Sequence, residues 1–389
     1  MKILFTLTPA FNPNGGGVQR TTWKLGKYFT GSGYEVSYYS LAKKGHVEVP
    51  FGTLHFAPEE NKNRNPENIR DLGRVLKKIK PDIVINQMPY EKELRDSLAG
   101  LKKEVGFRLI GCLRNSLFNF KNNARDQMQR MLPETLFRLM DNRAGIGLVQ
   151  WRHYIKHRLD LKAILDKHDF FILLAPPNRT ELEYFVGGYK KEKVRSIPNS
   201  IPAVQDQSVL SRKEKMILHV GRLNISQKRS DLLTEFWLKI HEKLPDWRFV
   251  IVGDGPYFKT LKKEIQDHNL PRIFLEGYQK PARYYQKASV FMMPSAYEGF
   301  PNTLLEAQSN GCAPVLFNSY AALDWITEDG KNAILTQPFN TEEMAASTEQ
   351  LIIQQDALGT MQKQDLENAR RFTIEKVGRE WEQLFTGIT

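Results

Sequence analysis

The stretch VFMMPSAYEGFPNTLLEAQSNGCAPVL, residues 290–316, limits most strongly what this chain can fold into. Its four apolar residues Val290–Met293 predict a buried parallel strand, and the run Asn302–Ser309 predicts a helix after a turn-rich loop. Asn310-Gly311 is a typical left-handed end for that helix, and Ala313–Phe317 starts the next strand. A strand, loop, helix and strand in this order predict an open α/β sheet whose ligand lies beyond a strand's carboxyl end.

The start of that helix has the chemistry of an anion site with acidic neighbours. The first backbone N–H groups of the helix, those of Asn302, Thr303 and Leu304, have no partner within the helix and lie at the positive end of its dipole, which suits phosphate. Glu298 precedes the helix and Glu306 lies within it. Because carboxylates repel phosphate, we expect these two to bind something else, such as sugar hydroxyls.

Strands alternate with helical runs along the whole chain. In the first half, Lys2–Thr8 and Glu35–Ser40 predict buried parallel strands, and in the second half Met216–Val220 and Trp247–Val252 do so. This alternation predicts a doubly wound α/β architecture. The best domain boundary is the proline-bracketed stretch 195–202, RSIPNSIP.

Length and charge narrow the function classes. A chain of 389 residues can form two domains with separate cores. Residues 1–200 hold 34 Lys and Arg against 20 Asp and Glu, whereas residues 201–389 hold 22 against 24. The basic half favours anionic partners such as lipid headgroups, although no nucleic-acid recognition motif accompanies it. Two distant cysteines, no signal peptide and no long apolar segment indicate a cytoplasmic protein.

The spacing of Glu298 and Glu306 in the context EGFPNTLLEA resembles the E-x7-E motif of glycosyltransferase family 4. That family consists of retaining enzymes with the GT-B fold, two Rossmann-like doubly wound domains facing a central cleft. The resemblance implies a domain of residues 1–200, with the C-terminal helix at about 373–389 packed back onto it, and a nucleotide-sugar-binding domain of residues 201–372. It also implies that the donor lies against Gly299, Phe300 and Pro301 as well as residues 302–304.

Three further motifs extend the resemblance. HVGRL followed by QKRSDLL is similar to the family's diphosphate-binding signature and implies that Arg222 and Lys228 neutralise the leaving diphosphate. Gly277-Tyr278 follows a strand where relatives bind the nucleotide base. Gly16-Gly17, in a GGV-x-R segment, would border the sugar and phosphate.

Arg114 departs from the family pattern, which has a histidine at this strand end to contact the transferred sugar. Arginine cannot accept a proton, but it can hold an anion or donate to hydroxyls. Three interpretations stay open: a different donor sugar (one with an acidic group, for example), altered activity, or a tolerant position.

The resemblance implies a retaining glycosyltransferase that moves a hexose-type sugar from a nucleotide-diphosphate sugar, with UDP favoured over GDP. The acceptor would be a glycan, a lipid-linked sugar or a cell-surface polysaccharide. Glu306 would hold the ribose, and Glu298 would orient the transferred sugar. Because the chain has no D-x-D, we expect no metal and no other cofactor. The alternatives are a GT-B-like sugar-nucleotide epimerase and a donor-binding relative altered by Arg114.

Residues 117–168 are both basic and apolar, with 14 Lys and Arg against 6 Asp and Glu over residues 101–168. Such a helical region either packs on its domain or lies against an anionic membrane surface. A peripheral position at the inner face of the membrane is therefore a second option for localisation. His153 and His157 are interpreted as ordinary residues of a basic helix face.

Overall fold

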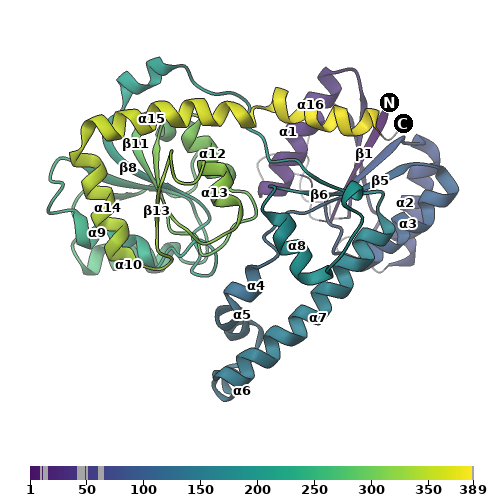
Figure 1. Cartoon of the computed structure of the whole chain (residues 1–389), viewed down its shortest axis with the longest axis horizontal. Coiled ribbons are helices and arrows are strands. Elements are labelled where there is room, and N and C mark those ends of the chain that lie inside the picture. Colours follow the sequence, from purple (N-terminus) through teal and green to yellow (C-terminus); the bar gives the residue numbers. More distant parts are fainter. Residues whose placement is uncertain (9–10, 12–15, 42–48, 50, 60–64, 388–389) are drawn as a thin grey trace. The chain divides into compact units, whose positions relative to one another are not determined.

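The computed structural model describes residues 1–8, 11, 16–41, 49, 51–59 and 65–387. The chain divides into two compact units (Figure 1). Unit 1 comprises Met1–Leu117, Asn142–Ser200 and the C-terminal segment from Ile374. Unit 2 comprises Phe118–Asp141 and Ile201–Thr373. Residues 118–141, which the sequence analysis placed in the first domain, thus group with unit 2.

Each unit is built on one parallel sheet, which confirms the predicted GT-B class with two Rossmann-like sheets. The sheet of unit 1 has seven strands in the order β3-β2-β1-β4-β5-β6-β7, all paired in parallel. In that order the strands are Thr53–Phe56, Glu35–Ser40, Lys2–Leu7, Ile83–Asn86, Arg108–Cys112, Phe170–Leu173 and Val194–Ser196.

The helices of unit 1 are α1 (Gly17–Gly31), α2 (Pro66–Ile79), α3 (Lys92–Val105), α7 (Arg143–Lys167), α8 (Asn178–Val186) and α16 (Ile374–Thr386). The C-terminal α16 packs against α1, with Trp381 and Phe385 buried. The rings of Phe29 and Phe385 lie 5.3 Å apart, and the Tyr28 hydroxyl donates to Glu382 at 3.1 Å. The apolar stripe of this helix therefore completes the core of unit 1.

The sheet of unit 2 has six parallel strands in the order β10-β9-β8-β11-β12-β13. In that order they are Ile273–Leu275, Arg248–Val252, Glu214–Val220, Ala288–Met293, Ala313–Phe317 and Ile334–Thr336. Its larger helices are α9 (Leu232–Ile240), α10 (Phe258–Asp267), α14 (Thr341–Ile353) and α15 (Gln355–Ala369). Shorter ones are α4 (Asn119–Asn122), α5 (Ala124–Met131), α6 (Glu134–Met140), α11 (Ala282–Lys287), α12 (Asn302–Gln308) and α13 (Ala322–Thr327).

The structure differs from the sequence-based expectation at two elements, and a third expectation cannot be checked. The strand β3 was not predicted, because it is a short edge strand of four residues, only half-buried over its last three. The residues Ser230–Lys243 predict a helix, but the helix observed there is shorter, Leu232–Ile240, because residues 230–231 and 241–243 form turns. The sequence PAFNPNGGG, residues 9–17, predicts a glycine-rich loop between the first strand and the first helix, and most of it, residues 9–10 and 12–15, lies outside the described residues.

Loops at the carboxyl ends of β10, β9 and β8 are joined by backbone hydrogen bonds. The N–H of Gly253 donates to Gly277 at 2.8 Å, and the N–H of Leu223 donates to Asp254 at 2.9 Å. Gly253 has φ 156°, and a Cβ at this residue would lie 1.8 Å from the carbonyl oxygen of Gly221. Only glycine permits this approach, so the VGDGP turn is a rigid support for the neighbouring loop 221–223.

Replacing Gly253 with alanine tests this support. We expect Gly253→Ala to lower the free energy of unfolding by about 2–4 kcal/mol, because the new methyl group collides with backbone and not with a movable side chain. Gly359→Ala is the matched control: Gly359 lies in α15 with open space around it, so alanine is expected to be neutral or stabilising by up to ~1 kcal/mol. Urea unfolding measures both changes, and equal stability of the two variants would contradict the close approach.

Candidate functional site

Glu298 lies in the loop between β11 and α12 and is one half of a buried ion pair. Its side chain is 8% exposed and that of Lys228 is 12% exposed. The Lys228 ammonium donates to Oε1 of Glu298 at 2.6 Å, and the amide of Gln227 donates to Oε2 at 3.1 Å. Both oxygens of the carboxylate are thereby held, so the structure brings together two of the predicted catalytic residues.

The loop after β8 is shaped around Asn224. Its side-chain oxygen accepts hydrogen bonds from the backbone N–H of Gln227 at 2.9 Å and of Lys228 at 3.0 Å. The carbonyl of Gln227 in turn accepts from the N–H of Ala296 at 2.7 Å, which ties this loop to the loop after β11. The orientation of Lys228 toward Glu298 therefore follows from loop geometry at two adjacent strand ends.

Arg222 lies in the same loop as Lys228, and His219 lies in the strand β8 that precedes this loop. The Arg222 side chain is exposed and makes no hydrogen bond or ion pair with any residue that the structure describes. His219 is fully buried in β8, with Nδ1 3.1 Å from the carbonyl oxygen of Met292. Burial, together with a smaller contribution from the nearby Lys228, lowers the pKa of His219 to about 4, so the imidazole is neutral at pH 7. Of these residues, only Arg222 presents an unengaged positive charge to a ligand.

The helix α12 begins at the predicted residue, Asn302, directly after Pro301. Among the described residues, the N-cap residue Pro301 gives this helix no side-chain capping hydrogen bond. Asn302 and Leu304 in the first turn are buried, and Thr303 is half-buried. Glu306 is half-buried one turn further along the same helix. The predicted elements of the donor site therefore share one strand–loop–helix unit.

The loop residues Gly299, Phe300 and Pro301 are buried. The ring of Phe300 packs against Phe372 and Trp325, at centroid distances of 5.6 and 6.1 Å. Phe300 therefore anchors the loop in the core of unit 2 through its side chain, which leaves only its backbone for a ligand.

The buried polar atoms in this region that have no hydrogen-bond partner within the described part of the chain include His219 Nε2, Ser295 Oγ, Asn302 Oδ1 and the Tyr320 hydroxyl oxygen. The Tyr320 loop is joined to the β11 loop by the Ser319 hydroxyl, which donates to the carbonyl of Ser295 at 2.6 Å. Burial raises the pKa of Tyr320, and the negative charge of Glu298 raises it further. Sequence reasoning did not name Gln227 or Tyr320 as site residues. Gln227 directly precedes Lys228 in the QKRSDLL motif, whereas no motif marks the residues around Tyr320.

Gly277 and Tyr278 follow β10, as predicted from the strand pattern. Gly277 has a left-handed backbone with φ 68°, and its carbonyl accepts the bond from Gly253. The Tyr278 side chain is 70% exposed. An exposed aromatic ring beside fixed main-chain groups can stack on a flat ligand.

In unit 1, Arg114 follows β5 and is held from two sides. Its Nε donates to the side-chain oxygen of Gln87 at 2.6 Å, and Nη1 donates to that of Asn199 at 3.4 Å. Nη2 is buried and has no hydrogen-bond partner among the described residues. Gly16 and Gly17, also in unit 1, are exposed at the start of α1.

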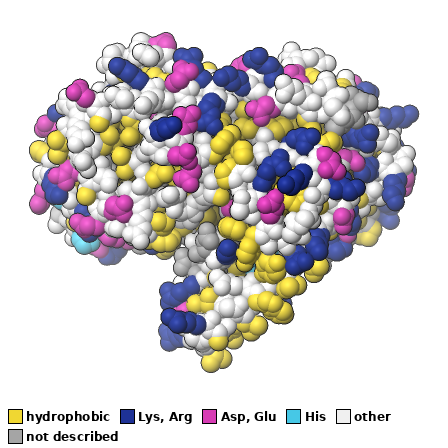
Figure 2. Space-filling model, viewed as in Figure 1, with side chains coloured by type: hydrophobic (Ala, Val, Ile, Leu, Met, Phe, Trp, Pro, Cys, Tyr) yellow, Lys and Arg dark blue, Asp and Glu magenta, His cyan; other side chains and the backbone are white. Residues whose placement is uncertain are grey.

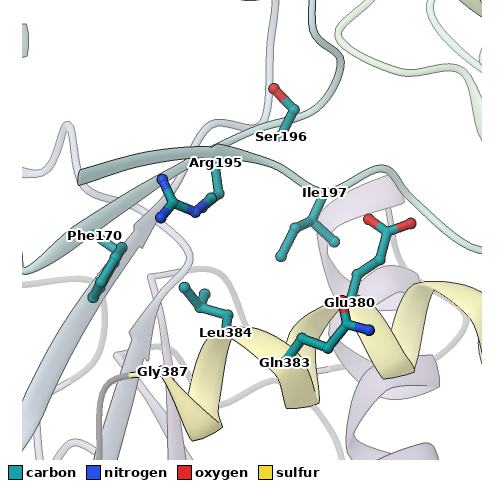
Figure 3. A pocket seen from close by; sticks show the side chains of 8 residues that line it. All are labelled: Phe170, Arg195, Ser196, Ile197, Glu380, Gln383, Leu384 and Gly387. Atoms are coloured by element: carbon teal, nitrogen blue, oxygen red, sulfur yellow. The ribbon is translucent and has the colours of Figure 1, made fainter. Parts of the chain in front are cut away.

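A pocket of about 280 Å³ in unit 1 contains none of the predicted site residues (Figure 3). It lies between α16 and the strands β6 and β7, at the edge of the sheet. Figure 3 shows the side chains of Leu384 and Ile197 in the middle of the lining residues, with the Ser196 hydroxyl turned away from them. Its lining residues are Phe170, Arg195, Ser196, Ile197, Glu380, Gln383, Leu384 and Gly387.

Comparison with known proteins adds a family match for unit 2. Residues 200–371 match the family described as glycosyl transferases group 1. An uncharacterised glycosyltransferase of Haemophilus influenzae is 29% identical over 195 residues, so the match spans 50% of this chain and only 55% of that relative. The amylovoran biosynthesis glycosyltransferase AmsD of Erwinia amylovora is 21% identical over 95% of this chain and 96% of AmsD.

The fold has solved counterparts. The crystal structure of HepE from Anabaena in complex with UDP and glucose covers 100% of both chains with a TM-score of 0.74 and 15% sequence identity. These findings confirm the resemblance to glycosyltransferases at the level of group 1, together with the GT-B fold. The assignment to family 4 and the role of each site residue stay predictions.

The buried ion pair generates a stability prediction. Glu298→Gln should lower the free energy of unfolding by about 2–4 kcal/mol, because it leaves the largely buried Lys228 ammonium without a countercharge. Asp246→Asn is the control, since the pair of Lys215 and Asp246 has a similar distance of 3.0 Å but both side chains are more than half exposed. That change should cost less than about 1 kcal/mol. Urea unfolding would contradict this account if both substitutions had the same small effect.

Proposed function

We propose that this protein is a retaining, metal-independent glycosyltransferase of family 4 type whose donor is a nucleotide-diphosphate sugar, UDP-linked in preference to GDP-linked. The observation that carries the proposal is the buried Lys228–Glu298 pair, together with the exposed Arg222 in the same loop as Lys228 and the start of α12, which Pro301 leaves without a side-chain cap. All four lie at the carboxyl ends of the adjacent strands β8 and β11, where open α/β sheets bind their ligands.

The chemistry of these groups suits the departure of a diphosphate. As the glycosidic bond to the donor sugar breaks, negative charge grows on the diphosphate oxygens. Arg222 and Lys228 stabilise that charge, and the free N–H groups of α12 donate to the same oxygens. Lys228 uses one hydrogen bond on Glu298, and its ammonium has two further N–H donors for phosphate.

Glu298 acts as a positioning carboxylate in this proposal. A retaining glycosidase uses a carboxylate nucleophile, but here both carboxylate oxygens already accept hydrogen bonds, from Lys228 and Gln227. Retention then follows the resemblance: the leaving phosphate accepts the acceptor's proton on the same face of the sugar. Glu306 binds the ribose hydroxyls, and the backbone after β10 contacts the base.

The acceptor is proposed to be a glycan, a lipid-linked sugar or a growing polysaccharide. The support is that AmsD, whose name assigns it to amylovoran biosynthesis, matches nearly the whole chain. HepE, a structural neighbour, was crystallised with UDP and glucose, which supports a UDP-linked hexose as donor.

The proposal keeps the roles that the resemblance implies for three residues of unit 1. Gly16 and Gly17 border the sugar and the phosphate, and Arg114 contacts the transferred sugar. The Nη2 group of Arg114, buried without a partner among the described residues, favours a donor sugar with an additional anionic or acceptor group. UDP-glucuronate is therefore a necessary member of any donor panel beside UDP-glucose.

Donor binding is expected to depend on Arg222. A nucleotide sugar that binds only the folded protein raises its melting temperature, so a panel of UDP- and GDP-sugars identifies the donor. Arg222→Ala should weaken that donor about tenfold to a hundredfold by losing a charged hydrogen bond, without changing stability, since Arg222 is exposed. Lys262→Ala, an exposed cation on α10, is the control and should leave binding unchanged. Equal affinity of both variants would refute the role of Arg222.

One turnover assay tests the proposed reaction. With the donor found in the panel and an acceptor, transfer should continue undiminished in EDTA, and proton NMR of the product should show the anomeric configuration of the donor. Loss of turnover that Mn²⁺ restores would contradict metal independence, and an inverted product would contradict retention. Free sugar and nucleotide without an acceptor would favour the epimerase-like alternative.

A further inference from the structure

The exposed side of α7 has a composition unusual for a helix face in contact with water. Leu148, Trp151, Ile155 and Leu159 are between 38% and 63% exposed. Their spacing of three or four residues places them on one side of the helix. Figure 2 shows hydrophobic side chains, interspersed with Lys and Arg, along the lower edge of the view, where Figure 1 labels α7.

The opposite side of α7 is anchored in unit 1. Leu161 and Ile164 are buried, and the ring of His157 packs against those of Phe185 at 4.8 Å and Tyr90 at 5.2 Å. Burial lowers the pKa of His157 to about 4, so this residue is a neutral packing ring and its interpretation as part of a basic face was wrong. Because the inner side is fixed by these contacts, the apolar stripe cannot turn inward without breaking them.

Cations flank the apolar stripe. Arg152, Lys156 and Lys162 are exposed and form no ion pair with any residue that the structure describes. The whole helix carries six Lys or Arg and two Asp, and one of the two, Asp160, lies 3.5 Å from the guanidinium of Arg95 on the inner side. Between residues 144 and 162 the exposed side therefore holds apolar and basic side chains and no acid.

We propose that this side of α7 docks the protein onto an anionic lipid bilayer, with Leu148, Trp151, Ile155 and Leu159 entering the headgroup region and Arg152, Lys156 and Lys162 contacting lipid phosphates. Exposed apolar side chains in a row with flanking cations fit an interfacial helix that lies in the plane of the membrane. Tryptophan prefers the same interface. No helix among the described residues is long and apolar enough to cross the bilayer, so the docking is peripheral.

Charge complementarity favours a bilayer over a second copy of the chain. Two copies joined through this stripe would bring their three flanking cations close together, and like charges repel. Four side chains on one helix also cover less area than a stable dimer usually buries. A bilayer rich in anionic lipid instead attracts each cation and accepts each apolar side chain.

The inference extends the proposed function by naming a partner surface. On the assumption that the transfer reaction uses a lipid-linked acceptor, docking would hold the enzyme where that acceptor is found. The docking itself is a property of α7, so it is tested without donor, acceptor or turnover.

Vesicle flotation at ~100 mM salt tests the proposal, with phosphatidylglycerol vesicles compared with phosphatidylcholine vesicles. We expect the wild-type protein to float with the anionic vesicles only. The charge variant (Arg152→Gln, Lys156→Gln, Lys162→Gln) should partition about a hundredfold more weakly, and the apolar variant (Leu148→Ser, Trp151→Ser, Leu159→Ser) should lose binding to a similar extent. The matched control removes three exposed cations elsewhere in unit 1, as Lys27→Gln, Lys103→Gln and Lys191→Gln, and should float like wild type.

Several outcomes would overturn the proposal. The proposal fails if the wild-type protein does not float with anionic vesicles. It also fails if the charge variant and the control lose vesicle binding equally, because binding would then depend only on net charge. A wild-type dimer in sedimentation velocity that both α7 variants dissociate, without vesicle binding, would show that a second copy occupies the stripe. The thermal stabilisation by the donor is measured on the wild-type protein and on every variant. A variant that is still stabilised is folded. If no donor stabilises the wild-type protein, the proposed function is refuted and the docking is not.

Discussion

The ion pair between Lys228 and Glu298 is the interaction on which the candidate site depends. Both side chains are almost completely removed from water, and such a pair is stable only when its geometry is good and the remaining polar atoms are satisfied. The geometry here comes from Asn224 and Gln227, which fix the loop after β8 and connect it to the loop after β11. The ion pair therefore forms only when the loops after the neighbouring strands β8 and β11 are correctly aligned.

The selectivity proposed for the site depends on the local arrangement of its charges and not on net charge. Arg222 and Lys228 are balanced by Glu298 and Glu306, and residues 201–389 as a whole carry 22 basic and 24 acidic side chains. In the proposed function, a nucleotide sugar binds this site in one orientation only, with its diphosphate at the cations and backbone N–H groups and its hydroxyls at the carboxylates. The excess positive charge lies in residues 1–200, and part of it flanks the apolar stripe of α7 that we propose docks onto a bilayer.

Much of this organisation could be predicted from the sequence, because parallel buried strands such as Val290–Met293 leave a strong apolar signal and the helix start at Asn302 follows a clear turn. The strand β3 could not be predicted, since an edge strand of four partly exposed residues has no such signal. Pairing of Lys228 with Glu298, 70 residues apart, depends on the order of β8 and β11 in the sheet, which local pattern does not encode. Likewise α7 is apolar on both sides, so only the contacts of His157 and Leu161 reveal which side faces water.

A crystal structure of the protein with UDP-glucose, or with whichever UDP-sugar stabilises it most, tests the central claim most directly. The account predicts that the diphosphate lies within hydrogen-bond distance of Arg222, Lys228 and the first N–H groups of α12, with Glu306 at the ribose. The account would be contradicted if the diphosphate bound elsewhere, for example in the pocket of unit 1 that Arg195 lines, and made no contact with an unchanged Lys228–Glu298 pair.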